Sequence, residues 1–219
     1  MTARALVLAG RARYGDPWHD HAATSYRVAC ELTAAGFDVD VRGTFPDALA
    51  DLPVSTLLVV NAGQGTADDD DATWLPLHER VRDHAAGGGP VLGLHQSAMA
   101  FADSPWWADV LGGRWVDGVS WHPEQAVTTF DVHPGHPVTD GLGALVVEDE
   151  RYTDLAVTPG VEVLVSHEEA GSRHPVVWAV PGRPVVYDGL GHGAEAYASP
   201  SRCALLRREA RWLVGLPVA

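Results

Sequence analysis

Short apolar runs that alternate with helical patterns constrain the fold more than any other feature of this sequence. In the first half of the chain we expect strands at 5–10, 37–41, 56–61 and 90–95, and helices at 22–35 and 74–86. The runs Leu57-Leu58-Val59-Val60 and Val91-Leu92-Gly93-Leu94 contain no polar side chain, which is typical of parallel strands buried on both faces. The sequence therefore predicts an α/β fold with a doubly wound, mostly parallel sheet of the flavodoxin type.

The pattern changes in the second half of the chain, where short strands follow one another without long helices between them. We expect strands at 127–132, 145–147 and 161–166, and an added β-hairpin whose strands, 176–179 and 185–187, flank a turn rich in proline and glycine. A final amphipathic helix is expected at 201–213, with arginines turned toward water. Because no linker or internal repeat interrupts this order, we expect a single domain over residues 1–219.

Charge and missing residue types exclude several classes of function. The 219 residues include 15 basic and 29 acidic ones, for a net charge of −14, which disfavours binding to nucleic acid or anionic membranes. The acidic run at 68–71 is most simply a solvated first turn of a helix. No lysine is present, which excludes Schiff-base lysine chemistry and a P-loop. Cys30 and Cys203 are too few for a disulfide scaffold, and without an export signal or a membrane-length apolar segment we expect a cytoplasmic protein.

Polar residues follow the expected strands at the points where those strands end. In an open parallel sheet, ligands bind beyond the carboxyl ends of the strands, so residues at these positions are candidates for a site. The candidates found in this way are His19, Asp20, Gln64, His95, Ser97 and His192. The sequence predicts that they meet in one crevice.

The segment Gly93-Leu94-His95-Gln96-Ser97-Ala98 indicates a sharp turn between a strand and a helix. Small residues around a reactive one at such a junction are typical of a nucleophile elbow, which forces the central side chain into the open. The central residue is His95, which can act as an acid, a base or a metal ligand but is a poor acyl carrier. We therefore expect His95 in the site and no acyl-enzyme chemistry.

A series of motifs in a characteristic order covers nearly the whole chain. The motifs are His19-Asp20, Ala35-Gly36-Phe37-Asp38-Val39, Gly93-Leu94-His95, Leu111-Gly112-Gly113-Arg114-Trp115 with His122 after it, His136-Pro137-Val138-Thr139-Asp140-Gly141-Leu142, Asp149-Glu150-Arg151-Tyr152, His174-Pro175-Val176-Val177-Trp178 and Gly189-Leu190-Gly191-His192. In order and spacing, these motifs resemble the ThuA-like (trehalose utilisation) family, which shares the class I glutamine amidotransferase-like fold. The resemblance implies that fold and a carbohydrate-related substrate.

One tripeptide resembles the His-Pro-Glu end of an amidotransferase triad. It is His122-Pro123-Glu124, which lies only 122 − 95 = 27 residues past the elbow, whereas in those enzymes it follows the last strands of the sheet. The elbow also has His95 in place of a cysteine, so glutamine hydrolysis through a thioester has no nucleophile. We expect no glutaminase activity.

The expected catalytic groups are three histidines and one carboxylate: His95, His122, His192 and Glu150. In one hypothesis the three histidines bind one divalent metal ion, zinc or manganese, which polarises a sugar carbonyl or activates a water. In the other hypothesis no metal is bound, and histidine and Glu150 perform acid–base chemistry on a sugar. The expected substrate-binding residues are His19, Asp20, Gln64, Ser97, Asp149 and Tyr152.

These expectations describe an enzyme of carbohydrate metabolism that acts on a disaccharide or keto-sugar. The alternative is a noncatalytic sugar-sensing or partner-binding protein on a degenerate amidotransferase scaffold, which the missing elbow nucleophile motivates. The expected partner is a small carbohydrate. The sequence also leaves open a homodimer formed through the apolar second half of the chain.

Overall fold

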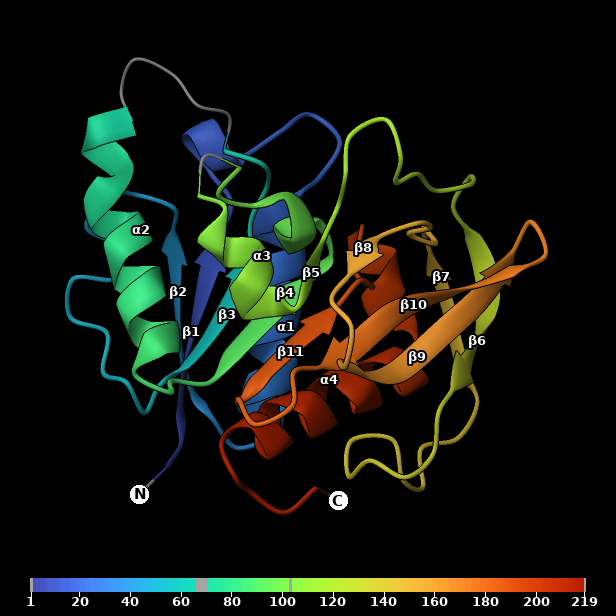
Figure 1. Ribbon diagram of the computed structural model, residues 1–219. Helices are drawn as coiled ribbons and strands as arrows, with labels where there is room; N and C mark the ends of the chain where they lie inside the picture. The colour runs from blue at the N-terminus through green and yellow to red at the C-terminus, as the bar shows by residue number, and fades with distance from the viewer. Residues whose placement is uncertain (1, 66–70, 103, 219) are drawn as a thin grey trace.

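The computed structural model describes residues 2–65, 71–102 and 104–218, and within them the main sheet has nine strands (Figure 1). Their order across the sheet is β2-β1-β3-β4-β11-β10-β9-β6-β7. The strands are β1 (Arg4–Ala9), β2 (Asp38–Gly43), β3 (Leu57–Asn61), β4 (Val91–Leu94), β6 (Ala126–Val132), β7 (Leu145–Asp149), β9 (Glu162–Glu169), β10 (Ser172–Ala179) and β11 (Val185–Asp188). A separate two-stranded piece pairs β5 (Gly113–Arg114) with β8 (Ala156–Val157).

The strands β2, β1, β3, β4 and β11 form a parallel unit covered by helices on both faces. Helices α1 (His21–Ala34) and α4 (Pro200–Leu213) pack on one face, and α2 (Asp71–Ala86) and α3 (Trp106–Leu111) on the other (Figure 1). The predicted doubly wound α/β fold is therefore confirmed. Of the acidic run predicted as a helical turn, positions 68–70 lie outside the described residues. No helix in the described ranges is long and apolar enough to cross a membrane.

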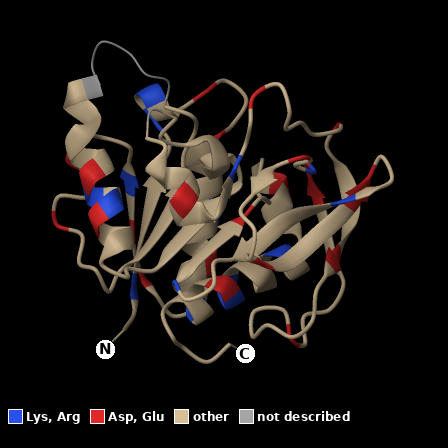
Figure 2. Cartoon of the chain, viewed as in Figure 1, with Lys and Arg blue, Asp and Glu red and all other residues tan. Residues whose placement is uncertain are grey.

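Alternate residues of the parallel strands face two separate cores. On β1, Val7 lies in the same core as Val28 of α1, and Leu8 lies in the same core as Leu77 of α2. All four side chains are fully buried. Burying a side chain of this size stabilises the fold by about 1.5–3 kcal/mol, so both helical layers hold the sheet. The central strands β3 and β4 carry no charged residue and are therefore tan in Figure 2.

The second half of the chain extends the same sheet with antiparallel strands. The strands β10 and β11 pair antiparallel, which confirms the expected hairpin. The strands β9, β6 and β7 follow, each antiparallel to its neighbour. Because the direction reverses four times between β11 and β7, β7 again runs in the direction of the parallel strands. Its carboxyl end therefore lies at the same edge of the sheet as theirs.

The last helix, α4, buries two charged residues that the sequence pattern did not reveal. Leu205 and Leu213 are buried as expected, but Arg202 and Glu209 are fully buried as well. The Nη1 atom of Arg202 lies 2.9 Å from Oδ2 of Asp188, which ends β11. Since a buried charge needs a partner, this ion pair is a fixed point between α4 and the sheet.

The start of α4 also protects the edge strand β7. Ser199 caps the helix by accepting a hydrogen bond from the backbone N–H of Arg202 at 3.2 Å, and it donates to the carbonyl oxygen of Val146. Ser201 Oγ accepts from the N–H of Val146 at 3.1 Å. The two serines thus satisfy both backbone groups of this edge residue, which would otherwise invite pairing with another chain.

We expect Ser199→Ala to lower the free energy of unfolding by about 1 kcal/mol, because the helix loses its N-cap acceptor. Chemical denaturation followed by far-UV circular dichroism measures this loss. Ser199→Asp, which keeps a capping oxygen, is expected to retain most of the stability. Equal losses in both variants would show that the contact with Val146, and not the cap, is the stabilising one.

Candidate functional site

Four side chains converge where the strands of the main sheet end. His19 follows β1, His95 follows β4, Glu150 follows β7 and His192 follows β11. Each offers one nitrogen or oxygen ligand atom, and these atoms all lie within 4.8 Å of one another. Three imidazoles and one carboxylate are the ligand types that zinc and related divalent metals take from proteins. We call these four residues the His/Glu cluster.

His95 occupies the predicted elbow in a strained conformation. Its φ angle is +41°, in the left-handed region that residues with a side chain rarely adopt. The Nδ1–H group donates to the carbonyl oxygen of Gly189 at 2.9 Å, so Nε2 is the nitrogen that faces the cluster, 3.4 Å from Oε2 of Glu150. The hydrogen bond to Gly189 thus fixes the tautomer in which Nε2 can act as a ligand or a base.

His19 is oriented in the same way by a carboxylate. Its Nδ1 lies 2.8 Å from Oδ1 of Asp16, and its Nε2 is buried with no hydrogen-bond partner among the described residues. Burial and the nearby His95 lower the pKa of His19 to about 4, so the ring is neutral near pH 7. A neutral, carboxylate-oriented imidazole with an unpartnered inner nitrogen is the usual state of a metal-binding histidine.

Glu150 lies at the centre of the histidines. Its Oε2 atom is 3.3 Å from Nδ1 of His192 and 3.4 Å from Nε2 of His95, and its Oε1 atom is 3.6 Å from Nδ1 of His122. Burial alone would raise the pKa of Glu150, but the nearby imidazoles of His192 and His95 lower it well below its ordinary value. The carboxylate of Glu150 in turn raises the pKa of His192. The carboxylate is therefore charged and can serve as a ligand or as a proton acceptor.

The loop that carries His192 is held by buried acceptors and donors. Asp149 accepts hydrogen bonds from the N–H groups of Gly191 and His192 at 2.6 and 3.1 Å. Asp188 accepts from the N–H of Leu190 at 2.9 Å, and Arg202 donates to the carbonyl oxygen of Leu190 at 3.2 Å. These contacts fix His192, and they also fix the Gly189 carbonyl that orients His95.

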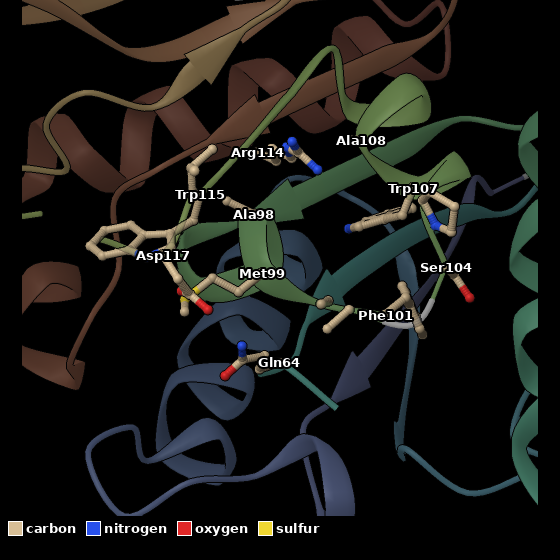
Figure 3. Close-up of a pocket in the computed structure, with 14 residues that line it drawn as sticks. Gln64, Ala98, Met99, Phe101, Ser104, Trp107, Ala108, Arg114, Trp115 and Asp117 are labelled. Atoms are coloured by element: carbon tan, nitrogen blue, oxygen red, sulfur yellow. The ribbon is translucent and has the colours of Figure 1, made fainter. Parts of the chain in front are cut away.

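A pocket of about 620 Å³ opens above the His/Glu cluster. Its lining combines the polar side chains Gln64 and Gln96 with the indoles of Trp18 and Trp115. A smaller cavity of about 250 Å³ adjoins it and shares Gln64, Met99 and Trp115 with it. Figure 3 shows these shared residues around the smaller cavity, together with Arg114, Asp117 and Trp107. The cleft therefore offers both hydrogen-bonding groups and flat apolar surfaces, which suits a polar ring ligand.

The structure brings together most of the side chains that the sequence proposed for the site. The predicted residues that line the pocket are His19, Gln64, His122, Glu150, Tyr152 and His192. His95 lies beneath them, with 2% of its surface exposed. His122 lies on the rim, since 39% of its side chain is exposed, and it belongs to the pocket but not to the His/Glu cluster. The metal ligands suggested by the sequence were His95, His122 and His192, so the cluster replaces His122 with His19 and Glu150.

Three of the predicted substrate contacts need correction. Asp20 is the N-cap of α1 and accepts from the N–H of Ala23, and it is not part of the pocket lining. Ser97 is fully buried beneath the elbow, and Asp149 is fully buried where it holds the His192 loop. Asp149 lies on the interior face because side chains of β7 alternate between buried and exposed.

Pocket residues that were not predicted from the sequence include Arg13, Gln96, Asp16 and Trp18. Asp16 orients His19, and Trp18 lines the pocket with 75% of its surface exposed. The spacing Asp16-x-x-His19 in the loop after the first strand is the signal that could have identified the carboxylate, because residues three apart in a tight turn can contact each other. Trp18 had no such signal in a chain with eight tryptophans.

Comparison with protein families identifies the group to which this chain belongs. A family model described as ThuA, trehalose utilisation, matches residues 4–213. The chain belongs to the ThuA family. This membership suggests a role in carbohydrate metabolism. A search of curated proteins gives no match.

Solved structures show the same fold. A ThuA-like protein of Parabacteroides merdae matches with a TM-score of 0.81 and 18% identity, over 100% of this chain and 92% of its own. A ThuA-like protein of Bacteroides uniformis matches with a TM-score of 0.73 and 18% identity, over 96% and 91%. A glutamine amidotransferase of Thermotoga maritima matches with a TM-score of 0.59 and 11% identity, over 98% and 99%. This ThuA protein therefore has the class I glutamine amidotransferase-like fold.

Proposed function

We propose that the His/Glu cluster binds one divalent metal ion, zinc or manganese, and that the pocket above it binds a carbohydrate on which this ThuA protein acts in the cytoplasm. The observation that carries the proposal is the unpartnered, buried Nε2 of His19, which lies among three further ligand atoms. Leaving such a nitrogen unsatisfied in the interior is unfavourable unless something binds there. The outer partners of His19 and His95, a carboxylate and a backbone carbonyl, are those that metal-binding histidines usually have.

The ligand class follows from the family and from the chemistry of the pocket. The family description refers to trehalose utilisation. Gln64 and Gln96 supply amide donors and acceptors for sugar hydroxyls, and Arg13 adds a cation to the lining of the same pocket. Trp115 offers a flat face for a ring, and it is held edge-on against Tyr152 with the ring centres 4.8 Å apart. A disaccharide or a keto-sugar fits this combination.

The residues of the cluster have distinct roles in this proposal. A bound metal would supply Lewis-acid polarisation of a sugar carbonyl or hydroxyl, or lower the pKa of a bound water. Glu150 holds the negative charge of the site and lies within reach of His122 at the rim, which can exchange a proton with a bound ligand. Burial raises the pKa of Tyr152 well above its usual range, so its hydroxyl keeps its proton and serves as a donor.

One contact favours a second candidate, metal-free acid–base catalysis. The hydroxyl of Tyr152 donates to Nε2 of His95 at 2.9 Å, which occupies a nitrogen that a metal would need. The two rings are 4.3 Å apart and inclined by 31°. A hydroxyl placed in line with the lone pair in the imidazole plane would hold the ring centres farther apart, so Tyr152 approaches from the side of the ring. The hydrogen bond from Tyr152 is therefore bent and weak, so the metal site stays the leading proposal.

Metal content measured by elemental analysis tests the proposal. Untagged protein purified without chelators is expected to contain close to one zinc or manganese ion per chain. The variants His95→Ala and His192→Ala are expected to lose most of it, because each removes one of four ligands. His133→Ala serves as the matched control, since His133 bonds to Ser166 outside the cluster and its loss should leave the metal in place.

The other outcomes are equally informative. Protein that holds no metal, even after dialysis against each ion, would reject the metal site and favour acid–base chemistry by His95 and Glu150. Saturable sugar binding without any product would favour a noncatalytic sugar-sensing protein. A metal retained in both histidine variants would show that the ion lies elsewhere.

A further inference from the structure

An exposed tryptophan stands beside the proposed metal site. Trp18 is 75% exposed, more than any other large apolar side chain described in the structure, yet it lines the pocket that opens above the His/Glu cluster. Trp107 and Trp178 are buried, at 2% and 0%, and the other exposed tryptophan of the described residues, Trp121, has 39% of its surface exposed. An indole left in water forgoes the stabilisation that burial would give it, so its position at a pocket mouth points to a ligand that covers it.

The loop that carries Trp18 is held in place by hydrogen bonds. The Oδ1 atom of Asp16 accepts hydrogen bonds from the backbone N–H groups of Trp18 and His19 at 2.8 and 2.9 Å. The same carboxylate contacts the ring of His19 at 2.8 Å. One carboxylate therefore sets the position of the indole and the orientation of a cluster histidine.

We propose that Trp18 is the residue on which a sugar ring stacks when it binds above the His/Glu cluster, and that Asp16 positions Trp18 and His19 as one unit. The apolar face of a pyranose ring, with its C–H groups, packs well on an indole, and its hydroxyls then reach Gln64 and Gln96 across the pocket. The inference rests on the proposed function, since it names the residue that holds the sugar in that site. A protein partner covering Trp18 is the competing occupant, and the experiment below separates the two.

Titration calorimetry on metal-loaded protein with trehalose, maltose, sucrose and glucose tests the inference. For each sugar that binds, Trp18→Ala is expected to weaken affinity about tenfold or more, and Trp18→Phe to keep most of it. Metal content should be unchanged in both variants, because Trp18 offers no ligand atom. Tyr26→Ala is the matched control, since Tyr26 is an aromatic residue 68% exposed on α1 and lies outside the pocket lining. Its affinity for sugar is expected to equal that of the parent.

Asp16 variants test the coupling. Asp16→Ala removes all three acceptor contacts, so both metal content and sugar affinity should fall. Asp16→Asn keeps a carbonyl oxygen for the two backbone N–H groups but loses the charge that faces His19. It should therefore lower metal content more than it lowers the affinity for sugar. If Asp16 has only a structural role, metal content and sugar affinity should fall together in Asp16→Ala and in Asp16→Asn. The losses should then follow the decrease in folded protein that circular dichroism measures.

The possible failures can be distinguished. Unchanged sugar affinity in Trp18→Ala overturns the inference and leaves the proposed function standing. No binding of any of the four sugars by metal-loaded parent protein also overturns it, and contradicts the carbohydrate part of the proposed function, while elemental analysis reports on the metal part separately. Unchanged sugar affinity combined with a dimer that dissociates in Trp18→Ala would assign the indole to a protein interface.

Discussion

Replacing Arg202 by methionine is expected to lower the free energy of unfolding by about 3–5 kcal/mol, a large share of the stability of a single domain. Arg202, Asp188 and Glu209 are all fully buried between α4 and β11. Burial and the nearby Asp188 raise the pKa of Glu209 well above its usual range, so Glu209 is neutral and Arg202 balances the charge of Asp188. Methionine fills much of the same volume but leaves a carboxylate in the interior without a cation.

Urea denaturation monitored by circular dichroism measures this effect as a lower midpoint with an unchanged slope. The double variant Arg202→Met with Asp188→Asn should recover part of the loss, because the new amide side chain is neutral and its carbonyl oxygen can still accept from the N–H of Leu190. Arg4→Met is the matched control, since Arg4 and Asp38 form a pair at 3.8 Å with side chains 56% and 72% exposed. That variant should show little change.

The result also bears on the candidate site. Arg202 donates to the carbonyl oxygen of Leu190, in the loop that ends at His192 and includes the Gly189 carbonyl that orients His95. Destabilisation at Arg202 should therefore be accompanied by weaker metal binding. A loss of less than about 1 kcal/mol would contradict the argument, because it would mean that Asp188 finds another partner or is neutralised at little cost.

The parallel half of the fold could be predicted from the sequence because its strands and helices are long and regular. Strands such as 57–61 are apolar on both faces, and only a sheet covered on both sides satisfies that pattern. The antiparallel half was predicted less completely. The strand β7 extends to Asp149 and β9 to Glu169, beyond the expected ends at 147 and 166. Polar residues at the end of a strand do not continue its apolar pattern, so the pattern alone sets the end too early. The short helix α3 was missed for a similar reason, since six residues are too few to show a periodicity.

The site could be predicted as a region but not as a set of contacts. Strand ends indicated His19, His95 and His192 because topology alone brings those positions together. Which carboxylate points inward depends on details that the sequence does not contain. Asp149 and Glu150 are adjacent, and only the pairing of β7 decides that Asp149 faces the interior while Glu150 reaches the histidines. Burial of Arg202 could not be foreseen either, because its partner Asp188 lies on another element.

Replacing Glu150 by glutamine is expected to weaken zinc or manganese binding by at least about 100-fold, a loss larger than the 10–100-fold typical of outer-shell substitutions. Glu150 is the one carboxylate of the cluster, and its oxygen lies 3.3–3.4 Å from nitrogens of two histidines. The side chain is charged, since the nearby imidazoles of His192 and His95 outweigh burial and lower its pKa. Glutamine keeps the shape but removes the negative charge that offsets the charge of the metal. Competition with a chromophoric chelator at fixed pH and ionic strength measures the change.

His122→Ala is the decisive companion variant, because the sequence alone placed His122 among the metal ligands. In the structure its Nδ1 lies 3.1 Å from the carbonyl oxygen of Pro123 and 3.6 Å from Glu150, and its side chain is 39% exposed on the rim. We therefore expect metal affinity to change less than about tenfold in His122→Ala, below the range for a well-packed outer partner. If His122→Ala loses as much affinity as Glu150→Gln, the ligands are the three histidines His95, His122 and His192, and the rim must close over the metal when it binds. If Glu150→Gln retains full affinity while His19→Ala loses it, the carboxylate is not a ligand, and its place between two histidines instead favours a role as proton acceptor.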